Sequence, residues 1–136
     1  MERPIFVVPP GYGVRQRDKY HYSQAVKIGN RVETSGQGGW SDDFEFPDDL
    51  GREIEVAFNN VERVLKAAGA AWGDVIAVNS YHVGFTEDVT QLMVGQLRKR
   101  MPSHCPIWTA IGVPALGGGP RMRVEVRVTA FITDRG

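Results

Sequence analysis

The sequence predicts a single α+β domain, residues 1–136, in which two helices pack on one face of a mixed sheet in the order β-β-α-β-α-β-β. A long apolar stripe with helical spacing occupies residues 54–68, and a run that alternates between apolar and polar residues occupies residues 121–130. Hydrophobic residues make up 42% of the chain and charged residues 24%, which is an ordinary globular composition. A chain of 136 residues can bury a core without disulfides or metal.

The first two strands are expected in "YSQAVKIG" (residues 22–29) and "RVETSG" (residues 31–36). Gly29-Asn30 lies between them and is typical of a tight hairpin turn. The segment "GGWSDDFEFPDDLG" that follows is polar and rich in turn-forming residues, so it predicts a long loop before the first helix.

Two helices enclose a buried strand. The apolar stripe of the first helix ends at Gly69, and acidic residues crowd its start, as expected for the two ends of a helix; the stripe consists of Ile54, Ala57, Phe58, Val61, Val64, Leu65 and Ala68. "DVIAVNSYHVG" (residues 74–84) is mostly apolar and predicts a central strand. The second helix is expected from about Thr86 to Met101, before Pro102, with Val89, Leu92, Met93 and Leu97 facing inward.

Two strands end the chain. In "IWTAIGV" (residues 107–113), Trp108, Ala110 and Gly112 share one face. The last strand places Met122, Val124, Val126, Val128 and Ala130 on an apolar face and Arg121, Arg123, Glu125, Arg127 and Thr129 on a polar one. Two helices cover only one face of such a sheet, so we expect the other face to meet another subunit.

Charge excludes some functions and leaves one question open. The formal net charge is zero, which disfavours a general nucleic-acid or membrane binder. The start of the chain has no long apolar core and no run approaches a membrane span, so a cytoplasmic protein is expected. Residues 41–62 hold eight acids against one base, and residues 95–136 hold seven bases against two acids. These segments form either two solvated faces or complementary surfaces between subunits.

Familiar catalytic groups are absent from the sequence. His104 and Cys105 are adjacent, and neighbours on an extended chain point to opposite sides, so a loop is favoured over a nucleophile–base pair. The histidines show no metal-ligand spacing and there is no second cysteine, so no metal site is expected. His82 lies within an apolar strand and is interpreted as a hydrogen-bonded core or interface residue. The glycine-rich stretches match no phosphate-binding motif.

Trp108 and Glu125 allow two interpretations. The indole of Trp108 stands beside the small residues Ala110 and Gly112, which would leave room for half of a pocket, and Glu125 lies among arginines on the neighbouring strand. A carboxylate in a dry site can orient or activate water. The alternative is a charge ladder on the surface, with Trp108 packed at an interface.

Several segments together resemble the YjgF/RidA (Rid) superfamily. They are "YSQAVKIGNRVETSGQ", "AFNNVERVLKAAGAAWGDVIAVNSYHV", "PIWTAIGVPAL" and "RVEVRVTAF", and the resemblance extends over residues 20–132. It implies a chorismate-mutase-like fold and a homotrimer with clefts between subunits. Active members are imine and enamine deaminases that need no cofactor, in which an arginine binds the substrate carboxylate and a glutamate on the final strand positions water.

The resemblance assigns a catalytic role to Glu125 and substrate-binding roles to Tyr22, Gly36, Met93, Trp108 and Ala110. Trp108 falls at the position of the carboxylate-binding arginine, and an indole, with no charge and a single donor, cannot replace a guanidinium there. In this respect the chain resembles the YjgH-like branch of the family. We therefore expect Trp108, Tyr22 and Met93 to line a less polar intersubunit pocket with Glu125 at its floor.

Three functions follow from these observations. The first is a Rid-type small-molecule hydrolase, deaminating a less polar or aromatic imine. The second is a ligand-binding or regulatory trimer that has lost the deaminase reaction. The third is an RNA-directed role as a ribonuclease or translation inhibitor, which zero net charge disfavours.

Overall fold

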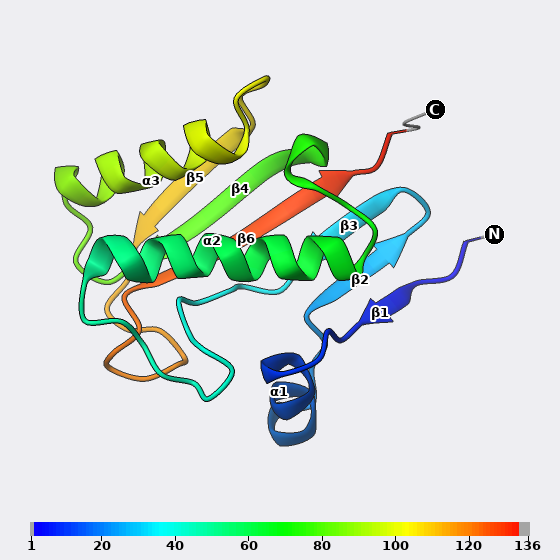
Figure 1. Cartoon of the computed structure of the whole chain (residues 1–136), viewed down its shortest axis with the longest axis horizontal. Helices are drawn as coiled ribbons and strands as arrows, with labels where there is room; N and C mark the ends of the chain where they lie inside the picture. Colours follow the sequence, from blue (N-terminus) through cyan, green and yellow to red (C-terminus); the bar gives the residue numbers. More distant parts are fainter. Residues whose placement is uncertain (1, 134–136) are drawn as a thin grey trace.

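The computed structural model describes residues 2–133 and contains a six-stranded sheet in the order β1-β2-β3-β6-β4-β5 (Figure 1). The strands are β1 (Ile5–Val7), β2 (Ala25–Ile28), β3 (Arg31–Thr34), β4 (Val75–His82), β5 (Ile107–Gly112) and β6 (Val124–Phe131). β4 and β5 are parallel and the other neighbouring strands are antiparallel. Helices α2 (Leu50–Ala67) and α3 (Glu87–Arg100) lie on one face of this mixed sheet, which confirms the predicted α+β class.

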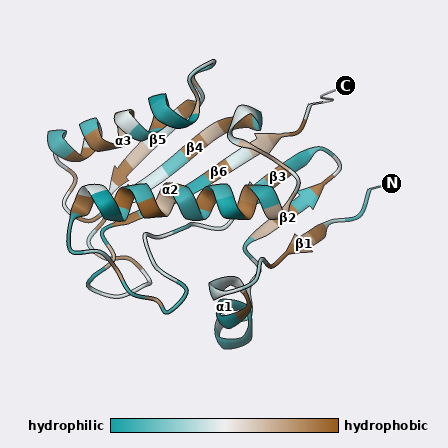
Figure 2. Ribbon diagram, viewed as in Figure 1, coloured by the Kyte–Doolittle hydropathy of each residue, from teal (hydrophilic) through white to brown (hydrophobic). Residues whose placement is uncertain are grey.

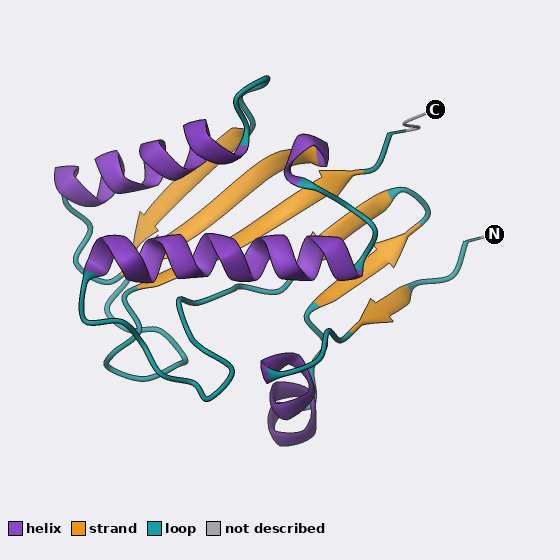
Figure 3. Cartoon of the chain, in the orientation of Figure 1, coloured by secondary structure: helices purple, strands orange, loops and turns teal. Residues whose placement is uncertain are grey.

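Two elements precede those expected from the sequence. The fold opens with β1 and with helix α1 (Tyr12–Tyr20), which Figure 3 shows apart from the two longer helices, beyond the start of β2. α1 buries only Tyr12, Gly13 and Gln16, so it has no apolar stripe that could reveal it, and β1 is a three-residue strand at the sheet edge. A short 3-10 helix, η1 (Trp72–Asp74), leads into β4.

The main core lies between α2 and the sheet, where the sequence periodicity placed it. The apolar stripe of α2 and the apolar face of β6 are buried, and Figure 2 shows hydrophobic and hydrophilic residues alternating along α2. Asp49 caps the start of α2, because its carboxylate accepts a hydrogen bond from the backbone N–H of Arg52 at 2.8 Å. Gly69, with φ of 81°, takes the left-handed conformation that follows the end of the helix.

A smaller aromatic cluster joins α1 to the loop after β3 and the loop before β6. Tyr12, Trp40 and Met122 are buried together, and Phe46 and Leu116 pack against them. The ring of Trp40 also stacks on Phe44, with centroids 5.0 Å apart. The polar loop expected after β3 is therefore fixed by its aromatic residues.

The acidic and basic segments meet within one chain, an arrangement different from both interpretations of the uneven charge. Arg121 pairs with Asp48 at 2.6 Å, and Arg123 pairs with Glu53 at 2.8 Å. Glu53 is fully buried and also accepts the backbone N–H of Arg123 at 2.7 Å. These contacts hold the loop before β6 against the start of α2. Within residues 2–133, no helix has the length and apolar character to cross a membrane.

Candidate active site

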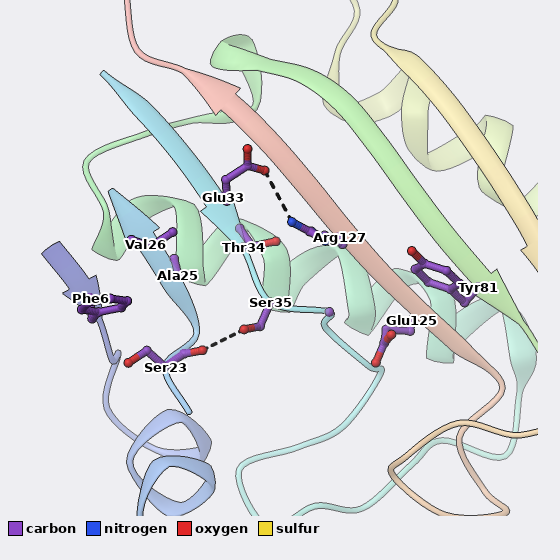
Figure 4. A pocket seen from close by; sticks show the side chains of 11 residues that line it. Phe6, Ser23, Ala25, Val26, Glu33, Thr34, Ser35, Tyr81, Glu125 and Arg127 are labelled. Carbon is purple, nitrogen blue, oxygen red and sulfur yellow. Dashed lines mark hydrogen bonds and ion pairs between the residues drawn. The ribbon is translucent and has the colours of Figure 1, made fainter. Parts of the chain in front are cut away.

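The polar residues of β6 project from the face of the sheet opposite α2 and α3, which we call the open face. Glu125 and Arg127 lie on it, and Tyr81 of β4 is the direct cross-strand neighbour of Glu125. Figure 4 shows these side chains around a cavity of about 500 Å³, the sheet cavity, whose other polar walls include Ser23, Glu33 and Ser35. The polar side chains that could contact a small molecule here are therefore two carboxylates, a guanidinium and several hydroxyl groups.

Gly36 lies directly beneath Glu125. A Cβ atom added to Gly36 would lie 2.3 Å from Cδ of Glu125, far closer than side-chain atoms approach one another. The absence of a side chain at Gly36 therefore leaves the space that the side chain of Glu125 occupies.

A second, smaller cavity adjoins the first at Glu125 and Gly36. It has a volume of about 200 Å³ and is called the aromatic cavity here, because its walls include Tyr20, Tyr22, Trp40 and Phe44. Gln16 and Met122 also line it. The structure therefore brings three predicted site residues together, namely Glu125, Gly36 and Tyr22.

Burial changes the acid–base properties of Glu125 and Tyr22. Loss of solvent raises the pKa of Glu125 above the ordinary value of 4.5. Burial also raises the pKa of Tyr22, and the nearby charge of Glu125 adds to that rise. Glu125 is consequently a stronger base than an exposed glutamate, and Tyr22 keeps its proton at neutral pH.

Arg127 is the arginine that shares the sheet cavity with Glu125. Arg121 and Arg123 are held away from it by Asp48 and Glu53. Arg127 has a long ion pair with Glu33, at 3.9 Å, and its side chain is half exposed. Glu33 is itself paired with Arg31 at 2.6 Å and accepts the hydroxyl of Thr129. The guanidinium of Arg127 is thus only loosely engaged by the protein.

Comparison with known proteins identifies the family. The family profile described as Endoribonuclease L-PSP matches residues 15–132. The chain is 30% identical over 117 residues to the RutC family protein YjgH of Escherichia coli (strain K12), with 86% of this chain and 87% of that protein covered. The chain belongs to the YjgF/RidA family.

Two further comparisons agree with this assignment. A solved structure of protein YjgH has a TM-score of 0.81 and 28% identity, covering 96% of this chain and 98% of that chain. The 2-iminobutanoate/2-iminopropanoate deaminase of Dermatophagoides farinae is 30% identical over 106 residues, covering 76% of this chain and 81% of that protein. The YjgF/RidA family thus includes a relative named as an imine deaminase.

Three residues assigned to the pocket lie elsewhere. Trp108 is paired with Val78 in the parallel register of β5 with β4, and Val78 is buried beneath the helices. Trp108 therefore faces the helix-covered side and packs against the core, and Ala110 shares its face. Met93 is fully buried in the same core. Within one chain the sheet lies between these three residues and Glu125, so the intersubunit pocket of Trp108, Tyr22 and Met93 stays a prediction that would need Trp108 and Met93 from another copy of the chain.

Trp108 is instead held by a buried hydrogen-bonded group. Its indole N–H donates to the hydroxyl oxygen of Ser80 at 2.9 Å, and that oxygen lies 2.8 Å from Nε2 of His82. His82 is buried and stacks on Phe85, which confirms its interpretation as a hydrogen-bonded core residue. The ring of His104 bonds the backbone carbonyl of Val75 at 2.7 Å, in the loop before β5, while Cys105 is exposed.

Sequence reasoning missed the aromatic walls of the site. Trp40 and Phe44 belong to the segment interpreted as a polar loop, and Gln16 and Tyr20 belong to the unexpected helix α1. The aromatic residues spaced through "WSDDFEF" were a signal that this loop is packed. Arg127 was recognised on the polar face of the last strand, and simple alternation already placed it beside Glu125.

Proposed function

We propose that the protein hydrolyses the C=N bond of a small imine, or of the enamine in equilibrium with it, releasing ammonia and a carbonyl compound. The observation that carries this proposal is the half-buried carboxylate of Glu125, whose pKa is raised and which lies where the sheet cavity and the aromatic cavity meet. Membership of a family that includes a named imine deaminase supports the same reaction class.

The reaction needs one base and balances without a redox partner. Glu125 takes a proton from water as the water oxygen bonds to the carbon of the protonated imine, which gives a neutral carbinolamine. Glu125 then returns that proton to the carbinolamine nitrogen, the C–N bond breaks and ammonia leaves, and Glu125 takes the hydroxyl proton as the carbonyl forms. A base with a pKa raised toward neutral suits this role, because it is strong enough to take the proton and still ionised at the working pH.

Arg127 is proposed to bind the carboxylate of an imino acid. It lies two residues from Glu125 on the same face of β6, about 7 Å along the strand. That spacing leaves room for a carboxylate against the guanidinium while the adjacent imine carbon faces Glu125. A bidentate arginine–carboxylate contact fixes orientation as well as charge.

The aromatic cavity is proposed to hold the rest of the substrate. Tyr22, Trp40 and Phe44 offer flat apolar surface next to Glu125, which favours an apolar or aromatic side chain. The expectation of a less polar substrate is therefore kept, but it now rests on α1 and the loop after β3 instead of on Trp108.

We also propose that the chain forms a homotrimer in which the open faces meet. Ile107 and Ile111 lie on the open face of the edge strand β5 and are 75% and 47% exposed. Apolar side chains on an uncovered sheet favour burial against another subunit, which would also close the sheet cavity from solvent. Light scattering should give three times the 15.1 kDa chain mass; a monomer would contradict this proposal.

Ammonia release tests the reaction. Imines are generated in situ from a panel of amino acids, and ammonia is measured with the wild-type protein and with Glu125→Gln. We expect faster release with the wild type, strongest for imino acids with apolar side chains, and the uncatalysed rate with Glu125→Gln. Tight binding of the same compounds without faster release would instead support a ligand-binding protein.

A further inference from the structure

A continuous chain of hydrogen bonds links two tyrosines through three buried glutamines. The hydroxyl of Tyr12 donates to Oε1 of Gln37 at 2.6 Å, and Nε2 of Gln37 donates to Oε1 of Gln24 at 2.6 Å. Nε2 of Gln24 then donates to Oε1 of Gln16 at 2.9 Å, and the hydroxyl of Tyr22 donates to the same oxygen at 2.5 Å. The three glutamines are at most 3% exposed, so water does not compete for these groups.

The direction of this chain is fixed at Gln37. Its Nε2 also lies 3.3 Å from the backbone carbonyl of Ser35, and a carbonyl oxygen can only accept, so the amide of Gln37 must point its NH₂ group that way. Its Oε1 then faces Tyr12, and its NH₂ group faces Gln24. Gln24 must therefore present its oxygen to Gln37 and its NH₂ group to Gln16, and Gln16 in turn presents Oε1.

The chain of hydrogen-bonded glutamines determines how Tyr22 can bind a ligand. The hydroxyl of Tyr22 has a single proton, and that proton is committed to Gln16. What remains for a ligand in the aromatic cavity is the lone-pair side of the phenol oxygen. Tyr22 and Glu125 line this cavity together, and the Glu125 carboxylate is also an acceptor when ionised.

We propose that this glutamine chain makes Tyr22 a hydrogen-bond acceptor, so that the group bound between Tyr22 and Glu125 is an N–H donor, namely a protonated imine or an ammonium. Gln16 also lines this cavity, and its part in the proposal is that of a positioning residue, because its Oε1 accepts the proton of Tyr22. The inference rests on the proposed function for the identity of the ligand. It also gives product release a physical reason, because the carbonyl oxygen of the product cannot donate and meets two acceptors.

Binding of a matched pair of probes tests the inference without any turnover. L-Alanine carries an ammonium where pyruvate carries a carbonyl oxygen, and the two are otherwise close in size. Calorimetry should show L-alanine binding at least about tenfold more tightly than pyruvate to the wild-type protein. Gln16→Met, which keeps the length of the side chain but lacks the amide oxygen, should lower this ratio without bringing it to one, because ionised Glu125 still accepts from the ammonium, and Tyr22→Phe should do the same.

Two further variants distinguish the positioning of the Tyr22 hydroxyl by Gln16 from a general loss of structure at the site. Gln16→Glu keeps an acceptor for Tyr22 and should keep the preference for L-alanine. The double variant Gln16→Met/Tyr22→Phe should change the ratio no more than either single change, because both remove the same interaction. Equal binding of the two probes by the wild type, or an unchanged ratio in Gln16→Met, would overturn the inference.

The two proposals fail in different ways. A lost probe preference with ammonia release intact would leave the hydrolase proposal standing and remove only the role of the glutamine chain. A clear preference for L-alanine in a protein that releases no ammonia would support the role of the glutamine chain and contradict the hydrolase proposal. If Gln16→Met fails to fold, the ratio in Tyr22→Phe and its retention in Gln16→Glu still decide the matter.

Discussion

The side chain of Glu125 occupies the space that a Cβ atom of residue 36 would fill. An added Cβ on Gly36 would lie 2.3 Å from Cδ and 2.6 Å from Cγ of Glu125. Gly36 is not among the residues with positive φ, so its backbone could accept another residue and only the close approach forbids one. The position and the ionisation of Glu125, the proposed base, therefore depend on residue 36 being a glycine, which has no side chain.

Gly36→Ala should displace the carboxylate of Glu125 and lower ammonia release by at least about tenfold, since misplacing a base by about 1 Å carries a large kinetic cost. The midpoint of thermal unfolding should change far less than the activity does. The matched control is Gly95→Ala in α3, where an added Cβ meets nothing within 4 Å. Full activity in Gly36→Ala would show that Glu125 does not need its present position.

The pH dependence of activity should report the raised pKa of Glu125. A base must be ionised to accept a proton, so kcat/KM should fall as the pH drops through the pKa of Glu125, and the midpoint should lie above 4.5. The measurement is ammonia release over the acid range, with imine concentration checked at each pH. A profile that is flat down to pH 4.5 would show that burial does not act on Glu125 as described.

Glu125 should also make the folded protein less stable as the pH rises. Because its pKa is raised on folding, the folded state binds more protons between pH 4.5 and the raised pKa, and the free energy of unfolding falls across that window. Glu125→Gln should therefore gain stability over the wild type above the window and lose that advantage below it. Urea unfolding at pH 4 and pH 7 measures this, with Glu45→Gln at an exposed position as the control.

Arg127→Gln should raise KM for imino acids and leave imines without a carboxylate unaffected. A hydrogen bond to a charged group is worth about 1.5–3 kcal/mol, which corresponds to roughly a tenfold to hundredfold change in KM. Arg121→Gln is the matched control, because Arg121 is paired with Asp48 outside the sheet cavity. Equal effects on substrates with and without a carboxylate would assign Arg127 a structural role.

Sequence patterns predicted the elements whose side chains alternate strongly between core and solvent. The apolar stripe that ends at Ala68 and the alternation around Glu125 predicted α2, β6 and the face of the proposed base. Helix α1 could not be predicted in this way, because a polar segment such as "YGVRQRDKY" is fixed by a few contacts to distant residues, including that of Tyr12 with Gln37. Local sequence patterns do not reveal contacts between residues that are far apart in the chain.

The location of Trp108 shows a second limit. Alternation correctly grouped Trp108 with Ala110 on one face of β5, but it could not say which face of the sheet that was. The parallel register with β4 decides this by pairing Trp108 with Val78, and register is set by the tertiary structure. The same limit explains why the paired acidic and basic segments were not foreseen as contacts within one chain.

Trp108 should accordingly be a residue for stability and not for specificity. Trp108→Phe keeps a ring against the core but loses the hydrogen bond to Ser80, so it should lower the free energy of unfolding by about 1 kcal/mol, plus the loss from the smaller ring. Trp108→Arg places a guanidinium on the helix-covered side and should cost more, in the upper part of the range of about 0.5–3 kcal/mol for single changes. Urea unfolding compares the two variants with the wild type.

Ammonia release from an imino acid should not increase in Trp108→Arg, because the sheet lies between residue 108 and Glu125. A gain of that activity with unchanged stability would mean that residue 108 reaches the site after all, and it would return the carboxylate-binding role from Arg127 to β5.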